Sequence, residues 1–174
     1  LRKLIAEEKA KYSASMLKDL SADILLHLEK HPAFRDAKTV LLYHSMKDEV
    51  YTHSFIDKWT DSKQIVLPVV VGDTLEIRRY EGIGSMKPGP YGILEPIGTV
   101  LDNYSSIDLV VVPGVAFDRE KNRLGHGKGY YDKILPQLAA YKIGICFPFQ
   151  LVEKVPADSF DVKMDAIIVG ASEI

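Results

Sequence analysis

The chain has 174 residues, of which 47% are hydrophobic and 26% are charged, and its formal net charge at pH 7 is −2. A chain of this length suits one domain, and roughly 70% of its unfolded surface can be buried around a single core. The composition is ordinary for a globular protein, and the near-neutral charge gives no reason to expect a nucleic-acid partner.

The cysteine count and the apolar runs bear on the compartment. Cys146 is the only cysteine, so an intrachain disulfide is impossible, and its apolar surroundings favour a core thiol over a nucleophile. The longest apolar run, residues 65–71, is far shorter than the ~20 residues that cross a bilayer. Residues 1–10 carry charges of both signs and lack the apolar segment of a signal peptide. We expect one cytoplasmic domain over residues 1–174, with no membrane partner.

The N-terminal part predicts two helices. Residues 2–11 are charged and favour a helix, and Ser13 can cap a second helix. Apolar residues recur in this second helix at helical spacing and are expected to pack in the core. They are Met16, Leu17, Leu20, Ile24, Leu25 and Leu28. His27 and His31 near its end are expected to be solvated or to interact with the helix C-terminus.

Strands and one more helix are predicted over the next fifty residues. Residues 39–44 predict the first strand, a helix is expected from about Thr52, and residues 64–71 predict the next strand. Residues 75–80 alternate apolar and basic side chains, which is typical of a half-exposed antiparallel strand at a sheet edge. Arg78 and Arg79 in that strand are either solvated or a weak candidate for a phosphate or glutamate-tail site.

Residues 81–96 contain four glycines and three prolines and predict a long loop. Compact domains seldom keep such a loop without a use, so we expect a lid or a wall of a binding site. A surface excursion is the alternative.

A buried strand is predicted at residues 107–112, and a glycine-rich loop follows it. Gly125, Gly127 and Gly129 alternate with His126 and Lys128. Glycines reach positive φ and carry no Cβ, so their N–H groups can turn together toward an anion, to which the lysine adds a positive charge. Because a helical pattern begins at residue 130, the loop is expected to present a phosphate at a helix N-terminus beside the carboxyl edge of a sheet.

Neither common phosphate motif fits this loop. The glycine spacing differs from the dinucleotide fingerprint, and Gly129 follows Lys128 where a P-loop has Ser or Thr for the metal. A metal ligand would have to come from elsewhere, and Asp132 is the nearest candidate. A flexible glycine turn before a helix is the alternative reading.

The C-terminal part completes the fold prediction. A helix is expected through about Ala140, then a strand over residues 142–147, a short helix near Phe149 and a last strand over residues 166–169. Strands that alternate with helices predict a layered α/β/α domain with a largely parallel sheet and an antiparallel edge.

Five motifs in chain order resemble those of the 5-formyltetrahydrofolate cyclo-ligase family, also called methenyltetrahydrofolate synthetase. They are residues 42–49, 67–68, 91–96, 112–132 and 161–165. The resemblance covers nearly the whole chain. It implies the same α/β fold and an ATP-dependent cyclisation of 5-formyltetrahydrofolate to 5,10-methenyltetrahydrofolate, with ATP, Mg²⁺ and a reduced folate as ligands.

The resemblance also implies roles for individual residues. The implied catalytic residues are Lys128, Arg123 and Tyr130, and the implied Mg²⁺ ligands are Asp132 and Asp161. ATP is expected at Arg2, Arg123, Leu124, Gly125, His126, Gly127, Lys128, Gly129, Tyr130 and Tyr131. The folate is expected at His44, Glu49, Tyr91, His126, Gly127, Lys128, Gly129 and Tyr130.

Simpler roles stay open for several of these residues. Asp132 would stabilise the first turn of its helix even without a metal, and His44 could be a strand-end residue that faces solvent. Tyr130 and Tyr131 either stack on ligand rings or only pack. A catalytically silent folate- or nucleotide-binding module of the same fold is the main alternative function, and a phosphotransferase acting on another amide is a third.

The chain departs from the family pattern at two places. Only Leu1 and Arg2 remain of an N-terminal Lys-x-x-Leu-Arg motif, so we expect that residues preceding Leu1 carry the matching lysine. His126 stands where relatives often have arginine. Imidazole titrates near neutrality and makes no bidentate phosphate contact, so we expect phosphate affinity to be lower or pH-dependent.

Overall fold

A seven-stranded sheet forms the centre of the computed structural model, which describes residues 1–157 and 161–174 apart from the side chain of Tyr91. The strand order is β12-β11-β9-β6-β1-β2-β3. The five inner strands run parallel: β1 (Thr39–Leu41), β2 (Gln64–Val71), β6 (Leu109–Val112), β9 (Tyr141–Ile145) and β11 (Ala166–Val169). β3 (Thr74–Arg79) and β12 (Ser172–Glu173) pair antiparallel at the two edges.

Both faces of the sheet are buried. Successive strand residues point to opposite faces, and here they pack into two different apolar clusters. In β6, Leu109 and Val111 join one apolar cluster, whereas Val110 and Val112 join the other. The same alternation occurs in β11, where Ile168 belongs to the first cluster and Ile167 to the second. Two buried faces require a continuous apolar run rather than an alternating one, as these strands have.

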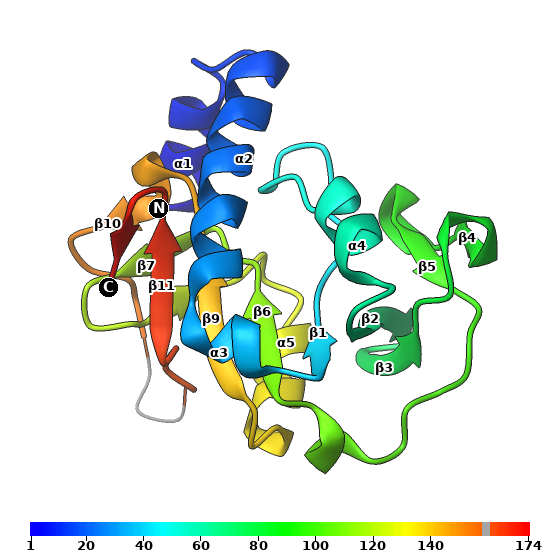
Figure 1. Cartoon of the computed structure of the whole chain (residues 1–174). Helices are drawn as coiled ribbons and strands as arrows, with labels where there is room; N and C mark the ends of the chain where they lie inside the picture. Colours follow the sequence, from blue (N-terminus) through cyan, green and yellow to red (C-terminus); the bar gives the residue numbers. More distant parts are fainter. Residues whose placement is uncertain (158–160) are drawn as a thin grey trace.

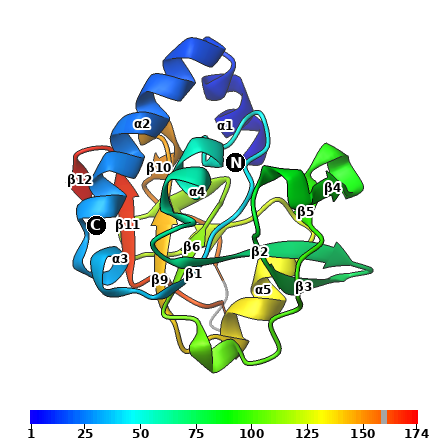
Figure 2. The same ribbon diagram turned by 45° about the vertical axis from the view of Figure 1, so that its right-hand side comes forward.

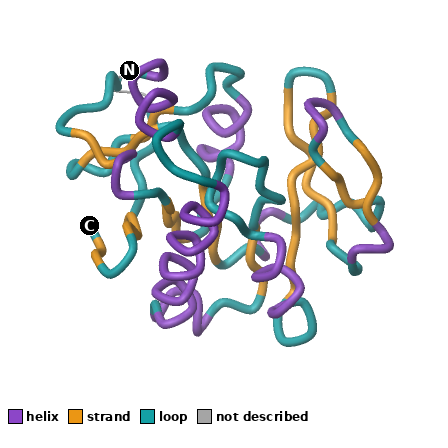
Figure 3. The backbone as a smooth tube through the Cα atoms, turned by 90° about the horizontal axis from the view of Figure 1, so that it is seen from above, coloured by secondary structure: helices purple, strands orange, loops and turns teal. Residues whose placement is uncertain are grey.

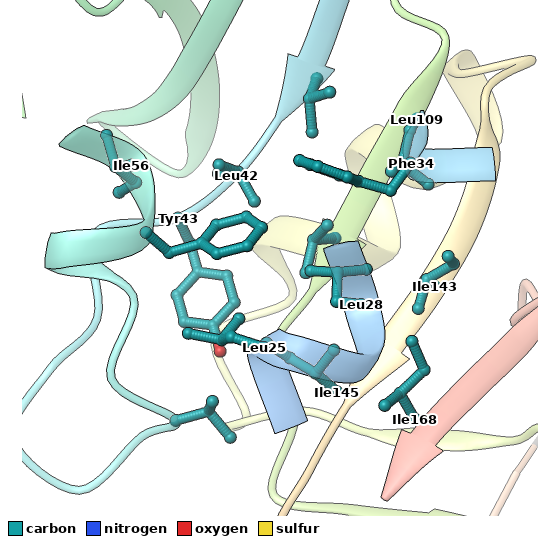
Figure 4. Close-up of a cluster of buried hydrophobic side chains, with 14 of the residues drawn as sticks. Leu25, Leu28, Phe34, Leu42, Tyr43, Ile56, Leu109, Ile143, Ile145 and Ile168 are labelled. Carbon is teal, nitrogen blue, oxygen red and sulfur yellow. The ribbon is translucent and has the colours of Figure 1, made fainter. Parts of the chain in front are cut away.

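Helices cover each face and complete three layers. α2 (Ala14–Lys30), α3 (Pro32–Asp36) and α4 (His53–Trp59) supply the first cluster, and α5 (Tyr130–Ile134) with the 3-10 turn η4 (Leu135–Gln137) supplies the second (Figures 1 and 2). α1 (Arg2–Lys9) precedes them. Figure 4 shows Leu25 and Leu28 of α2 and Phe34 of α3 in one apolar cluster with the sheet residues Ile143, Ile145 and Ile168. The predicted α/β/α fold is therefore confirmed.

Most predicted elements are present, with shifted ends. Ser13 caps α2 as expected, since its Oγ accepts a hydrogen bond from the Met16 N–H at 3.1 Å. Met16 itself does not pack in the core, because 49% of it is exposed. The first strand stops at Leu41 instead of residue 44. The helix expected to reach residue 140 ends at Ile134, where the chain tightens into a 3-10 turn around Pro136.

The segment over residues 81–96 is more ordered than predicted. It folds into a small antiparallel hairpin of β4 (Met86–Pro88) and β5 (Leu94–Pro96), with 3-10 turns η1 (Ile83–Ser85) and η2 (Pro90–Gly92). Figure 3 shows this hairpin at the end of the molecule away from both termini. In the described ranges, none of the helices is both long enough and apolar enough to cross a membrane.

A small second sheet, which the sequence did not predict, carries the chain from the main sheet to the glycine loop. It has the order β10-β7-β8 and consists of β7 (Ala116–Asp118), β8 (Arg123–Leu124) and β10 (Leu151–Val152). The remaining 3-10 turns are η3 (Tyr104–Ser106) and η5 (Pro148–Gln150). β8 ends directly before Gly125, so this sheet positions the start of the loop.

The buried carboxylate of Asp118 holds this small sheet together. Its Oδ1 accepts hydrogen bonds from the backbone N–H groups of Glu120 and Asn122, each at 3.0 Å. Its Oδ2 accepts from the Val155 N–H at 3.0 Å and from the Asn122 side-chain amide at 3.1 Å. Burial raises the pKa of Asp118, but these four hydrogen bonds outweigh it, so the net pKa lies below the ordinary value.

Replacing Asp118 by Asn should destabilise the fold. One carboxylate oxygen becomes an NH₂ group that cannot accept from the N–H groups facing it, so we expect the free energy of unfolding to fall by about 2–4 kcal/mol at pH 7. Because the pKa of Asp118 is lowered, this difference should shrink in acid as the native carboxylate becomes protonated. Urea unfolding measures it, with the exposed Asp102→Asn as control. A loss no larger than in the control would contradict this role.

Candidate functional site

A pocket of about 490 Å³ lies beside the carboxyl ends of β1 and β6. Tyr43 and His44, which follow β1, form one part of its wall, and Pro113, which follows β6, forms another. The chain moves from β1 to β2 on one side and later returns to place β6 on the other side of β1. The pocket therefore lies at the point where the strand order reverses, which is the usual ligand position in open α/β sheets.

The pocket brings together the predicted site residues except one. Those that line it are Arg2, His44, Glu49, Arg123, Leu124, Gly125, His126, Gly127, Lys128, Gly129, Tyr130, Tyr131, Asp132 and Asp161. The side chain of Tyr91 is outside the described part of the structure. Residues more than a hundred positions apart thus share one wall, which only the fold could establish.

Two of the three glycines in the loop adopt the positive φ that the sequence analysis expected of them. Gly127 has φ 96° and Gly129 has φ 76°, both in the left-handed region that favours glycine. Arg2 lies against the loop, since its Nε donates to the Gly125 carbonyl at 2.9 Å. A Cβ at Gly127 would lie 3.8 Å from the guanidinium carbon of Arg2. The first helix therefore places a cation directly on the loop.

Arg123 supplies a second, deeply placed cation. Its side chain is 6% exposed, and its Nε donates to the Pro113 carbonyl at 2.6 Å. One terminal nitrogen lies 3.7 Å from Asp132, and the guanidinium carbon lies 5.1 Å from the centroid of the Tyr131 ring. A Cβ at Gly125 would come within 3.0 Å of this guanidinium, so the glycine leaves the room that Arg123 fills.

The charge of Arg123 persists despite its position. Burial lowers its pKa, while Tyr131, Asp132 and Glu49 oppose that shift. An arginine side chain stays protonated in proteins even so. The pocket therefore holds a permanent positive charge beneath the glycine loop.

His126 and Lys128 are exposed at the mouth of the pocket. Desolvation lowers the pKa of His126 below its ordinary value, and the nearby Arg123 lowers it further. The imidazole is therefore mainly neutral at pH 7, so the histidine offers a hydrogen-bond donor where an arginine would offer a charge.

Glu49 and His44 form the opposite wall and have unusual protonation. Glu49 accepts a hydrogen bond from the Met46 N–H at 2.8 Å, and burial raises its pKa to about 7. His44 is only 9% exposed, so it does not face solvent. Burial and then the neighbouring His53 lower the pKa of His44 to about 4. At neutral pH this wall carries a neutral imidazole beside a carboxyl group close to its titration point.

Two side chains of the site escaped the sequence analysis. The His53 ring stacks on His44 with a centroid distance of 3.6 Å and an interplanar angle of 14°, and its Nε2 lies 2.8 Å from the Ser45 carbonyl oxygen. The buried Glu95 of β5 lines the pocket and accepts from the Val70 N–H at 2.8 Å, which ties the hairpin to β2. Glu95 lies within the motif of residues 91–96, but the sequence analysis gave it no role of its own.

Asp132 and Asp161, the two residues predicted to bind a metal, both line this pocket. Asp132 is 62% exposed at its side chain, and Asp161 is also exposed. Within residues 1–157 and 161–174, His, Cys, Asp and Glu form no group of three or more that is ready to hold an ion. This donor set fits a magnesium ion that takes few protein carboxylates and completes its shell with phosphate oxygens and water.

Comparison with known proteins agrees with this architecture. A family model described as the 5-formyltetrahydrofolate cyclo-ligase family matches residues 1–170. A probable 5-formyltetrahydrofolate cyclo-ligase from Schizosaccharomyces pombe is 31% identical and aligns over 97% of this chain and 92% of its own. The 5-formyltetrahydrofolate cyclo-ligase of Haemophilus influenzae is 35% identical over 78% of each chain.

Solved structures show the same likeness. The NMR structure of Aquifex aeolicus 5,10-methenyltetrahydrofolate synthetase is 32% identical, with a TM-score of 0.88 over 99% of this chain and 89% of that one. A 5,10-methenyltetrahydrofolate synthetase from Mycoplasma pneumoniae is 29% identical, with a TM-score of 0.76 over 96% and 94% of the two chains. The chain therefore belongs to the 5-formyltetrahydrofolate cyclo-ligase family.

Proposed function

We propose that this protein is a cytoplasmic, single-domain 5-formyltetrahydrofolate cyclo-ligase that uses ATP to form 5,10-methenyltetrahydrofolate, releasing ADP and phosphate. The observation that carries the proposal is the pocket at the sheet reversal, where Arg2, Arg123 and Lys128 meet Glu49. Cations gathered around a glycine loop suit a polyphosphate, and a carboxyl group opposite them suits the N–H groups of a pterin ring.

The reaction needs the formyl oxygen to become a leaving group. The γ-phosphoryl group of ATP is transferred to that oxygen, and the bond between the γ-phosphorus and the bridging oxygen breaks to give ADP. N10 then attacks the activated carbon and loses its proton, and the carbon–oxygen bond breaks to release phosphate. Such a transfer depends on in-line positioning and on charge stabilisation more than on covalent participation by the protein.

The cations of the pocket are arranged for that task. Arg123 is fixed by Pro113 and Tyr131, so its charge needs no reorganisation when phosphate charge develops. Arg2 is fixed on the loop through Gly125, and Lys128 contributes a charge at the exposed mouth. Tyr130, which begins α5 on the same wall, is suited to stack on or hydrogen-bond to a ligand ring.

Asp132 and Asp161 would hold magnesium, which would neutralise charge on the phosphates during transfer. Asp132 lies 3.7 Å from Arg123, so the carboxylate also offsets part of that positive charge. The remaining contacts of the triphosphate would come from the loop amides, the two arginines and Lys128.

Turnover tests the proposal directly. The protein, ATP, magnesium and 5-formyltetrahydrofolate should produce the absorbance of the methenyl product, and Lys128→Ala should lower kcat/KM roughly 100-fold or more because it removes charge stabilisation from the transferred phosphoryl group. Lys154→Ala, exposed and outside the pocket, should keep wild-type activity and both variants should keep the circular dichroism spectrum of the fold. A wild-type protein that binds both ligands without forming product would instead favour a silent binding module.

Glu49 should make folate recognition pH-dependent. Its pKa of about 7 in the free protein means that it is protonated below pH 7 and loses its capacity to accept two N–H hydrogen bonds. We expect kcat/KM for the folate to fall toward acid by about tenfold per pH unit below 7. Glu49→Gln should give a low kcat/KM that does not fall further toward acid, whereas the exposed Glu153→Gln should keep the pH dependence of the wild type. If Glu49→Gln keeps that pH dependence, the Glu49 carboxyl group is not its source.

Asp132→Asn should raise the magnesium concentration that gives half-maximal activity, roughly tenfold, because one anionic ligand is lost. Asp73→Asn serves as the matched control. Asp73 pairs at 3.3 Å with Lys133, which lies in the same helix as Asp132, but Asp73 itself lies outside the pocket. Titration of magnesium at saturating ATP measures the effect. Equal magnesium requirements in the two variants would show that Asp132 does not bind the ion.

A further inference from the structure

α1 contacts both walls of the pocket: Arg2 binds the glycine loop, and Lys9 pairs with Asp48 in the segment that carries Glu49. We propose that Lys9 is a positioning residue for the folate. Its ion pair with Asp48 holds the turn that ends at Glu49, and α1 thereby ties this turn to the glycine loop. The inference rests on the proposed function, because Glu49 faces the folate in that reaction.

One face of α1 makes both contacts. Arg2, Ile5 and Lys9 are three and four positions apart, so their side chains lie on the same side of the helix. The Arg2 Nε donates to the Gly125 carbonyl at 2.9 Å, and the Lys9 Nζ lies 3.6 Å from the Asp48 Oδ2. The first and last of these helix residues are about 10 Å apart along the axis, so one short helix spans the two walls.

The helix is fixed between its two polar contacts. Ile5 is 4% exposed and packs in an apolar cluster with Val115. Beyond the end of the helix, the Tyr12 ring stacks on Phe149 with a centroid distance of 4.9 Å, and the Tyr12 N–H donates to the Lys9 carbonyl at 3.1 Å. The Lys9 side chain is itself only 15% exposed. Packing therefore restricts this side chain, which lowers the entropy cost of the ion pair.

Asp48 lies in a short turn that ends at Glu49. The Glu49 N–H donates to the Met46 carbonyl at 3.1 Å, and the Met46 N–H donates to the Glu49 Oε1 at 2.8 Å. These two hydrogen bonds close residues 46–49 into one unit. The position of Asp48 therefore sets the position of the Glu49 carboxyl group.

The two charges of the ion pair act on both walls of the pocket. Burial has the largest effect on the pKa of Glu49 on one wall and on the pKa of His126 on the other. Asp48 raises both pKa values, and Lys9 lowers both. An isolated surface ion pair would have no such effect on two separate segments, so this pair lies at the junction of the turn and the glycine loop.

Other charged and titratable groups also act on these two residues and come from several elements. They include Arg2 of α1, Tyr43 after β1, Arg123 of β8 and Tyr131 of α5. Because these groups stay in place when the ion pair is changed, a shift in the titration of Glu49 or His126 reports on Lys9 and Asp48.

Loss of the ion pair should weaken folate recognition. Lys9→Met and Asp48→Asn should each raise the KM for 5-formyltetrahydrofolate about two- to fivefold with kcat unchanged, whereas Lys9→Arg, which keeps the charge, should match the wild type. The double variant should lose no more than either single variant, because both changes remove the same contact. Lys11→Met, which breaks the exposed pair with Glu8 at 2.8 Å, is the matched control. Additive losses, or equal kinetics of Lys9→Met and the control, would overturn the role of Lys9.

An NMR titration of the ligand-free protein gives a readout that general loosening of the fold would not reproduce. With ¹³C-labelled carboxyl and imidazole groups, Lys9→Met should raise the titration midpoints of Glu49 and His126 by about 0.2–0.7 pH unit, and Asp48→Asn should lower both. Lys11→Met should leave both midpoints at the wild-type values. Midpoints that move in the same direction in the first two variants, or that do not move, would overturn the inference.

The two tests separate failure of this inference from failure of the proposed reaction. The NMR titration needs neither ligand nor turnover, so opposite midpoint shifts support the placement of the ion pair even if the wild type forms no product. Normal turnover by the wild type together with unmoved midpoints would refute the role of Lys9 and leave the cyclo-ligase function intact.

Discussion

The buried guanidinium of Arg123 is the constraint on which the site depends. Desolvation of a cation is costly, and here the Pro113 carbonyl, the Tyr131 face and the more distant Asp132 carboxylate offset part of that cost. The carboxylate is exposed and 3.7 Å away, so it neutralises the charge incompletely. In the proposed function, the phosphates of ATP on the glycine loop would supply the missing countercharge. The glycine at position 125 suits the same constraint, because an added Cβ would come within 3.0 Å of the guanidinium and press on it.

The fold has to deliver Arg123 to this position, and it does so through an excursion from the main sheet. After β6 the chain makes the β7–β8 hairpin, whose turn is closed by the Asp118 carboxylate, and only then enters the loop. Asp118 also binds the Val155 N–H, so the hairpin cannot shift independently of the C-terminal segment. Asp118 stabilises the small sheet, and Arg123 lines the pocket. Because both residues lie in the same hairpin, the position of one depends on the position of the other.

The sequence predicted what depends on local pattern and missed what depends on long-range packing. Residues 64–71 form β2 as predicted, because a continuous apolar run matches a strand buried on both faces. The glycine loop was likewise readable from spacing. In contrast, β8 has two residues and no periodicity of its own. The contact between Arg2 and Gly125 joins positions 123 residues apart, and the ring stacking of His53 on His44 depends on the turn between a strand and a helix.

The wall that Glu49 and His44 form inverts the usual order of two titrations. In water a glutamate loses its proton before a histidine does, but here the pKa of Glu49 is about 7 and that of His44 is about 4. Between those values both side chains are uncharged. Over the same range the raised pKa of Glu49 makes the free energy of unfolding fall as pH rises, whereas the lowered pKa of His44 makes it rise. The two slopes oppose each other, so the wall can change its charge near pH 7 with little net effect on the stability of the fold.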